Sequence, residues 1–266
     1  MKIDIIYTYY NNNHESTTRL LNMYLDHWSN NFNNTKHNIN FVIIDDHSPK
    51  KAIDIVKKTN INCNLQLYYV EDDILWNEMG ARNLGASQTT SDIILFLDWD
   101  TFIYEKLIFD IFKFFKTNTK TKTCGRFYQK MYREGKVIEP KDAGVGSMSA
   151  TGFSFLREHW NYFGPFDEDF AGGYGGYDLF FLNYIKKLNI SRRCVSNLPV
   201  LLLPPGTTKN VYRDKLNNKN VIISKNKGIT RDPTTKKIII NKQFDNYFPP
   251  LNIIRFKWKN QYENIL

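Results

Sequence analysis

The sequence predicts an α/β fold in which a mostly parallel central sheet is flanked by helices. Short apolar runs typical of buried strands alternate with segments whose apolar residues have helical spacing. Three of the first four predicted strands run into carboxylates, which would place an acidic rim along one edge of the sheet. A chain of 266 residues is long enough to bury one large core.

The first half of the chain carries the clearest alternation. Strong β formers predict a first strand at 3–8, an Asn-rich stretch predicts a loop after it, and a Ser/Thr cap predicts a helix at 16–28. The same reasoning predicts further strands at 41–44, 65–70 and 93–97, with helices at 52–58 and 77–87 between them. These three later strands are the ones followed by acidic residues.

The second half is less regular. Residues 104–115 have apolar side chains at helical spacing, which favours a core helix over a helix on a membrane surface. A strand is predicted at 124–130, and one long strand at 193–203. Between them, a loop rich in glycine and aromatic residues at 163–178 leads into a predicted helix at 179–188.

From residue 207 the organisation changes. We expect residues 1–206 to form one domain, and residues 207–266 to form a basic loop and a C-terminal extension packed on it. Residues 209–227 predict a surface loop or a short helix, and Ile238–Ile240 a small edge strand. The aromatic residues at 256–258 suggest a tail that packs against the body.

The composition narrows the functional classes. The net charge of +9 permits phosphate, nucleic-acid or anionic-membrane partners, but the basic residues are scattered. Only residues 255–259 combine basic and aromatic side chains, so a nucleic-acid binder is not expected. No stretch has the length of a transmembrane helix, which leaves peripheral membrane contact open.

The cellular compartment is predicted from the start of the chain and from its cysteines. The first residues read as a strand and not as a signal peptide. Cys63, Cys124 and Cys194 are too few and too far apart for a disulfide framework or a zinc site, so we expect a cytoplasmic location.

Asp98 and Asp100 follow the predicted strand at 93–97. In open α/β sheets, ligands bind beyond the carboxyl ends of the strands. Two carboxylates held close together repel each other, so a positive charge is expected between them, and a divalent cation with oxygen ligands suits that position. The alternative is a polar strand exit that accepts backbone hydrogen bonds.

Six segments of the chain match a known pattern in the correct order. They are Ile5–Asn11, Val42–Ser48, Gly80–Gly85, Phe96–Asp100, Gly164–Glu168 and Gly175–Asp178. Together they resemble the GT-A glycosyltransferases, specifically family 2 and its galactosyltransferase-like relatives, over roughly residues 1 to 185. The resemblance implies a GT-A (Rossmann-like) fold with a mixed, mostly parallel sheet.

The resemblance also implies a site for a nucleotide-sugar donor. Tyr10 would stack on the base with Thr8 near it. Asp46, together with Asp45, would accept from the imide N–H of the base, a preference that suits uracil. Arg82 would either face the donor or pair with the acidic rim.

The same resemblance assigns the cation and the chemistry. Asp98 and Asp100 would hold Mn²⁺ or Mg²⁺ at the donor diphosphate, Asp100 more directly. Asp178 would take the proton from the acceptor hydroxyl, although its position also suits a plain helix cap. Tyr174 and Tyr177 would offer flat faces to an acceptor sugar.

Two departures from the family pattern concern the acceptor side and the metal. Tyr177 stands where relatives have a glutamate next to the aspartate, and no histidine follows His159 to serve as a third metal ligand. The basic residues Arg213, Lys215 and Lys219 would be able to close over the diphosphate instead.

The prediction is therefore an inverting, metal-dependent glycosyltransferase that moves a hexose-type sugar from a UDP-linked donor to a hydroxyl of a glycan or other acceptor. A catalytically impaired sugar- or nucleotide-binding protein on the same fold is the main alternative. A nucleotidyltransferase ranks lower because residues 9–13 contain neither the glycine nor the lysine that its phosphate loop needs. The oligomeric state is left open.

Overall fold

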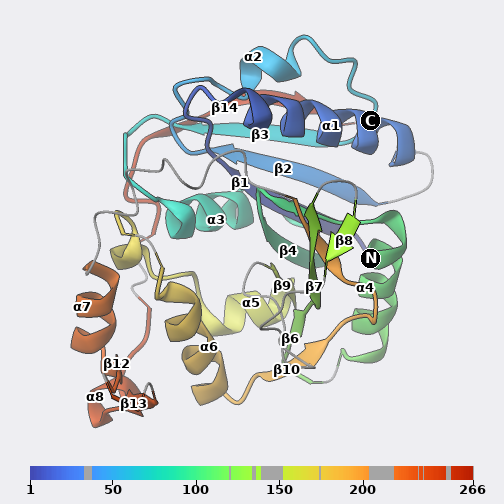
Figure 1. The fold of residues 1–266 in the computed structure, drawn as a ribbon. Coiled ribbons are helices and arrows are strands. Elements are labelled where there is room, and N and C mark those ends of the chain that lie inside the picture. The colour runs from blue at the N-terminus through green and yellow to red at the C-terminus, as the bar shows by residue number, and fades with distance from the viewer. Residues whose placement is uncertain are drawn as a thin grey trace.

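The structure is a computed structural model that describes residues 1–32, 38–119, 121–133, 136–138, 152–173, 175–203, 219–232, 234–235, 237–249 and 253–265. Its centre is an eight-stranded sheet with the order β10-β6-β9-β4-β1-β2-β3-β14 (Figure 1). Strands β3, β2, β1 and β4 are parallel neighbours, whereas β9 and β14 run antiparallel to the strands beside them. The predicted mixed, mostly parallel sheet is thus confirmed. Its strands are β1 (Ile3–Tyr9), β2 (Ile39–Asp45), β3 (Leu65–Val70), β4 (Ile93–Asp98), β6 (Thr123–Arg126), β9 (Gly152–Leu156), β10 (Ser191–Cys194) and β14 (Trp258–Asn264).

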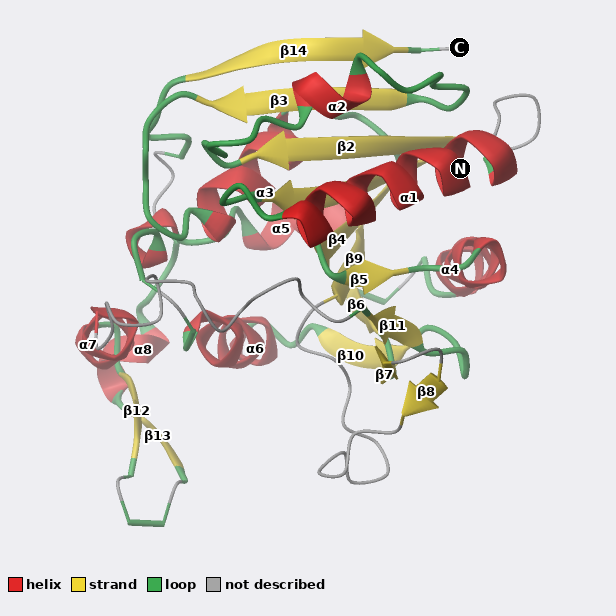
Figure 2. Cartoon of the chain, turned by 45° about the horizontal axis from the view of Figure 1, so that its top comes forward, coloured by secondary structure: helices red, strands yellow, loops and turns green. Residues whose placement is uncertain are grey.

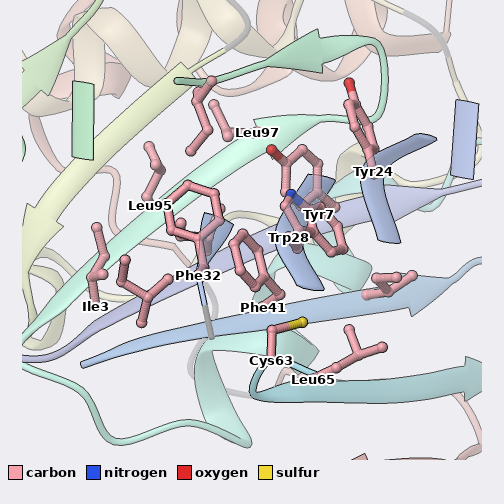
Figure 3. Close-up of a cluster of buried hydrophobic side chains, with 14 of the residues drawn as sticks. Ile3, Tyr7, Tyr24, Trp28, Phe32, Phe41, Cys63, Leu65, Leu95 and Leu97 are labelled. Carbon is pink, nitrogen blue, oxygen red and sulfur yellow. The ribbon is translucent and has the colours of Figure 1, made fainter. Parts of the chain in front are cut away.

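The central strands fill two apolar cores, one on each face of the sheet. On β1, Ile5 and Tyr7 lie in one core and Ile6 in the other, because successive side chains of a strand point to opposite faces. In the first core, Trp28 stacks on Phe41 with ring centroids 4.2 Å apart (Figure 3). That core is closed by α1 (Glu15–Asn31), α2 (Ile53–Val56) and α4 (Glu105–Thr117), the second by α3 (Glu78–Ser87), α5 (Arg157–Phe163) and α6 (Tyr177–Lys187).

A buried ionic network holds the amino ends of the parallel strands. Asp4 on β1 pairs with Arg157 at 3.1 Å and accepts from the backbone N–H of Ser91 at 2.9 Å. Arg157 also donates to the hydroxyl of Thr89 at 2.9 Å. This end of the sheet is therefore closed by its own polar contacts, which leaves the carboxyl ends as the edge where a ligand would bind.

Two strand predictions are wrong in the same way. The stretch 193–203 forms two strands, β10 and β11 (Val200–Leu202), which belong to different sheets. A turn in which the Ser196 hydroxyl accepts from the backbone N–H of Leu198 separates them. Likewise, 124–130 divides between β6 and β7 (Gln129–Arg133). The second sheet has the order β5-β11-β7-β8, with β5 at Thr101–Phe102 and β8 at Lys136–Ile138.

The C-terminal extension is a set of short elements followed by an edge strand. It comprises α7 (Lys219–Asn226), β12 (Ile229–Arg231), β13 (Ile238–Ile240), α8 (Lys242–Asp245) and β14. Strands β12 and β13 pair only with each other in a two-stranded sheet, whereas β14 pairs with β3 and completes the central sheet. The three cysteines are free. Within the described ranges, no helix combines the length and apolarity needed to cross a membrane.

Candidate donor and acceptor site

The carboxyl ends of β1, β2 and β4 lie side by side (Figure 1). Thr8 on β1 stands in register with Ile44 on β2 and with Asp98 on β4, and Tyr9 stands opposite Asp45. Because the register is parallel, the residues that follow these strands emerge at the same edge of the sheet. The structure therefore brings together most of the residues that the sequence predicts for the donor.

The residues predicted to hold the base lie at the end of β1 and on the loops that follow β1 and β2. Thr8 and Tyr10 are half-buried, and Asp46 is buried. The backbone N–H of Asp46 donates to the carbonyl of Tyr9 at 2.8 Å, which ties the two loops together. One carboxylate oxygen of Asp46 accepts from the backbone N–H of Asn77 at 3.2 Å, so the loop before α3 also helps to position it.

Asp45 has a different role from the one predicted. Its side chain is fully buried, and its two oxygens accept from the backbone N–H groups of Ser48 at 2.9 Å and Ala52 at 2.7 Å. Burial raises its pKa to about 6, and these hydrogen bonds lower it in part. Asp45 thus holds the turn between β2 and α2, and the sequence-based assignment to the base-binding set is corrected for this residue.

Arg82 on α3 is the buried cation beneath the acidic rim. Its Nη2 lies 2.5 Å from Glu78 Oε1 and 2.6 Å from Asp98 Oδ1, and its guanidinium lies 5.5 Å from the ring centroid of Phe166. Its Nε and Nη1 are buried and have no hydrogen-bond partner in the part of the chain that the structure describes. The sequence left two roles open for Arg82, facing the donor or pairing with the acidic rim, and the structure shows the pairing.

Asp98, Asp100 and Asp178 share one electrostatic environment. Burial raises the pKa of Asp98 well above its usual value, Glu78 raises it further, and Arg82 opposes the rise. Asp100 and Asp178 add smaller increases to the pKa of Asp98. Burial raises the pKa of Asp100 to about 6 and that of Asp178 to about 6, and Glu78 adds to both. Mutual perturbation of this kind is typical of carboxylates that meet in a functional site.

The carboxylates after β4 match the ligand chemistry of a hard divalent cation. Asp100 Oδ1 is buried without a hydrogen-bond partner in the described chain, and the side chain of Asp98 is 31% exposed. No group of three or more His, Cys, Asp or Glu side chains that could hold a metal occurs within the described ranges. Two carboxylates can nevertheless be enough, because Mg²⁺ is usually bound by one or two carboxylates of the protein together with water and substrate phosphates. The residues present therefore fit Mn²⁺ or Mg²⁺ bound together with a diphosphate.

Asp178 lies in the first turn of α6 and does not cap it. The capping position belongs to Gly176, whose φ of +79° is in the left-handed region that favours glycine. The carboxylate of Asp178 is half-buried, and the charges of Arg82 and Arg126 lower its pKa against the larger effect of burial. The alternative of a plain N-cap is thus not observed.

Tyr177 lies in the apolar core and not on an acceptor-facing surface. Its side chain is 6% exposed, and its ring stacks on Phe181 and makes an edge contact with Phe170. The sequence-based expectation of a flat face for a sugar is therefore corrected: the ring has no exposed face, because aromatic packing takes both sides of it. Tyr174, the other predicted acceptor residue, lies outside the described residues.

Two asparagines hold Phe166 and the glycines before α6 in place. Asn83, next to Arg82, accepts from the backbone N–H of Phe166 at 2.9 Å and donates to its carbonyl at 2.9 Å. Asn220 on α7 is buried and donates to the carbonyls of Gly173 at 2.7 Å and Gly175 at 2.8 Å, just before α6. The glycine-rich loop before Asp178 is therefore fixed by the C-terminal extension.

The acidic segment at 167–169 anchors that extension. Asp167 and Asp169 both lie 2.7 Å from Lys227 Nζ, and Asp167 accepts from the hydroxyl of Tyr247 at 2.5 Å. Glu168 accepts from the backbone N–H of Ile254 at 2.7 Å. The segment that resembles an acceptor motif thus has a structural use in this chain.

Sequence reasoning missed Glu78, Arg126 and Asn220. Glu78 carried a usable signal, because it stands four residues before Arg82 on one helix face. Arg126 and Asn220 reach the site only through the tertiary fold. Of the basic residues expected to close over a diphosphate, Lys219 instead donates to the Ala171 carbonyl, and the other two, Arg213 and Lys215, lie outside the described residues.

The fold is similar to those of known glycosyltransferase structures. The S. aureus TarS 1-349 structure in complex with UDP-GlcNAc superposes with a TM-score of 0.56 at 19% identity, covering 76% of this chain and 58% of that one. The structure of GalNAc-T7 with UDP, GalNAc and Mn²⁺ superposes with a TM-score of 0.57 at 15% identity, covering 79% of this chain and 45% of that one. This chain therefore spans less than two thirds of either chain, and the likeness shows a shared fold.

A search of curated proteins found no match to the sequence. The family model described as "Glycosyl transferase family 2" matches residues 4–177, a range that includes β1 to β4, Arg82, Asp98 and Asp100. The match covers more than half of the chain and agrees with the fold and with the acidic edge described above. The protein belongs to glycosyl transferase family 2.

Proposed function

We propose that the protein is an inverting, metal-dependent glycosyltransferase that moves a hexose-type sugar from a UDP-linked donor to a hydroxyl of a glycan or related acceptor. The observation that carries the proposal is the convergence of Asp100 and Asp178 on Asp98, which pairs with the buried Arg82 at the carboxyl edge of the sheet. The solved complexes of TarS with UDP-GlcNAc and of GalNAc-T7 with UDP and Mn²⁺ support the choice of donor and cation.

The donor would lie across the ends of β1, β2 and β4. Tyr10 and Thr8 are half-buried there, and Asp46, which accepts from the backbone N–H of Asn77, would accept from the base. Arg82 keeps two buried N–H donor atoms, Nε and Nη1, that no described residue uses. Because Arg82 is 1% exposed and pairs with Glu78 and Asp98, its proposed role is to hold Asp98 in position below the diphosphate.

Asp98 and Asp100 would hold the cation. When bound, Mn²⁺ or Mg²⁺ supplies Lewis-acid stabilisation of the charge that develops on the leaving diphosphate. Asp100 brings a buried oxygen without a partner in the described chain, whereas one oxygen of Asp98 is already bound to Arg82. We therefore assign the more direct contact to Asp100 and a positioning role to the pair formed by Asp98 and Arg82.

Asp178 would act as the general base. Inversion requires the acceptor hydroxyl to attack from the face opposite the leaving diphosphate and to give up its proton to a nearby base. A pKa raised to about 6 leaves the carboxylate ionised at neutral pH and makes it a stronger base than an ordinary aspartate. Asn220 and Gly176 would position it through the loop that begins α6.

The test is transfer from a panel of nucleotide-sugars, measured together with donor binding. Asp178→Asn should lose transfer while it retains affinity for the donor, because the change removes a proton acceptor and keeps the shape. Asp26→Asn, an exposed position on α1, is the matched control and should behave as wild type. Unchanged transfer by Asp178→Asn would remove this residue as the base.

A second candidate function is a sugar- or nucleotide-binding protein without turnover. It is favoured by Tyr177, which lies in the core at the position where the family resemblance implies a glutamate. Binding of UDP with no release of sugar from any donor, with or without Mn²⁺, would support this alternative over the enzyme.

A further inference from the structure

The hairpin of β12 and β13 carries three isoleucines that nothing in the described chain covers fully. Ile238, Ile239 and Ile240 expose 40%, 42% and 47% of their surface. Successive side chains of a strand point to opposite faces, so both faces of the hairpin present apolar groups to water. Figure 2 shows the hairpin projecting from the body of the protein, away from the central sheet.

Helix α7, which contacts β12, carries two further exposed apolar residues. Val221 exposes 60% of its surface and Ile222 exposes 55%. We call the three isoleucines of β13 the hairpin patch. A two-stranded hairpin is at best marginally stable by itself in water, so a surface that covers it would stabilise it.

The sequence around the hairpin patch is basic. Residues 219–249 contain seven Lys or Arg and two Asp, a net charge of +5 in a chain whose total is +9, and one of the seven, Lys227, is paired with Asp167 and Asp169. Lys237 directly precedes the isoleucines, and Lys242 follows them. Asp232, at the start of the hairpin turn, accepts from the backbone N–H groups of Thr234 at 2.9 Å and Thr235 at 2.6 Å, so its carboxylate is used within the turn.

We propose that the hairpin patch docks on an anionic membrane surface. The isoleucines would enter the boundary between headgroups and acyl chains, while the lysines that flank them bind the headgroups. A bilayer interface surrounds an inserted hairpin and so covers both of its faces, whereas a protein partner on one face would leave apolar side chains of the other face in water. The projection of the hairpin from the body allows this approach without displacing the central sheet (Figure 2).

The lipid surface is tested by sedimentation of the full chain with phosphatidylcholine vesicles that contain or lack phosphatidylglycerol. We expect binding only to the vesicles that contain phosphatidylglycerol, and weaker binding as salt increases, because charges near a surface are screened. The combined change Ile238→Ser, Ile239→Ser and Ile240→Ser should weaken binding by about tenfold or more. Met23→Ser on α1, a position 42% exposed, is the matched control and should bind as wild type.

A second variant keeps the result informative if the serine variant unfolds. Lys237→Gln with Lys242→Gln should weaken binding and reduce its salt dependence, whereas Lys57→Gln with Lys58→Gln near α2 should not. Three results would overturn the proposal: no binding of the folded protein to either vesicle, equal binding by wild type and the triple serine variant, or a dimer in solution that the serine variant abolishes. None of these measurements depends on catalysis, so they stand apart from the proposed function.

Discussion

Replacing Tyr177 by alanine should destabilise the fold, because the ring is a core residue. Its centroid lies 4.9 Å from that of Phe170, 5.7 Å from Phe166 and 5.9 Å from Phe181, and 6% of the side chain is exposed. Truncation of a buried aromatic costs about 3–5 kcal/mol, and we expect the free energy of unfolding to fall by that amount. Tyr177→Phe should cost less than about 1 kcal/mol, because the hydroxyl accepts only a long hydrogen bond of 3.4 Å from the backbone of Asp167.

Urea denaturation followed by tryptophan fluorescence measures the free energy of unfolding of both variants. Tyr162→Ala is a useful control, since that side chain is 54% exposed on α5, and it should change the free energy by less than about 0.5 kcal/mol. The reasoning fails if Tyr177→Ala keeps the wild-type midpoint and instead raises the KM for an acceptor. That outcome would return Tyr177 to the acceptor-binding role that its burial argues against.

Three further predictions concern the glycine-rich loop before Asp178, the pH dependence of transfer and the pH dependence of stability. Asn220→Ala removes two hydrogen bonds to the carbonyls of Gly173 and Gly175, so it should lower the free energy of unfolding by about 1–3 kcal/mol and slow transfer at unchanged donor affinity. Asn226→Ala, at an exposed position, is the control. An equal loss of donor binding would contradict a role confined to this loop. The raised pKa of Asp178, about 6, predicts that kcat/KM for transfer rises with pH through that value, and a flat profile would contradict it. Burial raises the folded-state pKa values of Asp100 and Asp178, so the folded protein binds more protons than the unfolded chain between about pH 4 and 6. The contribution of these two residues to the free energy of unfolding therefore falls as pH rises through this window. Asp178→Asn should make this fall less steep, which urea titrations at several pH values measure.

The parts of the fold that were predicted correctly are those with strong local patterns. The strand at 65–70 has the predicted bounds, and the helix at 104–115 packs in the first core as expected. The final strand β14 was missed because its sequence, Trp258–Asn264, is polar and half-exposed, with no period-two pattern of apolar residues. It becomes a strand by pairing with the edge of β3, which no local signal reports.

The same contrast between local sequence patterns and tertiary contacts applies to the site. Asp98, Asp100 and Asp46 follow apolar strands, so their place at one edge could be predicted from the parallel order. Whether an aromatic residue packs in a core or faces a ligand is not encoded locally, and Tyr177 was therefore misassigned. Asn220 reaches the glycine-rich loop from 45 residues further along the chain, a contact that only the tertiary fold creates.

The cation role of the acidic edge is tested most directly by release of UDP from a UDP-sugar with and without Mn²⁺, in wild type and in Asp100→Ala. We predict that wild-type turnover requires Mn²⁺ and that the variant loses about a hundredfold or more of it, because the oxygen that completes the protein side of the cation site is gone. Thermal unfolding of both proteins without metal serves as the control for folding. Equal turnover in the two proteins, or wild-type turnover that is indifferent to Mn²⁺, would contradict the proposed mechanism.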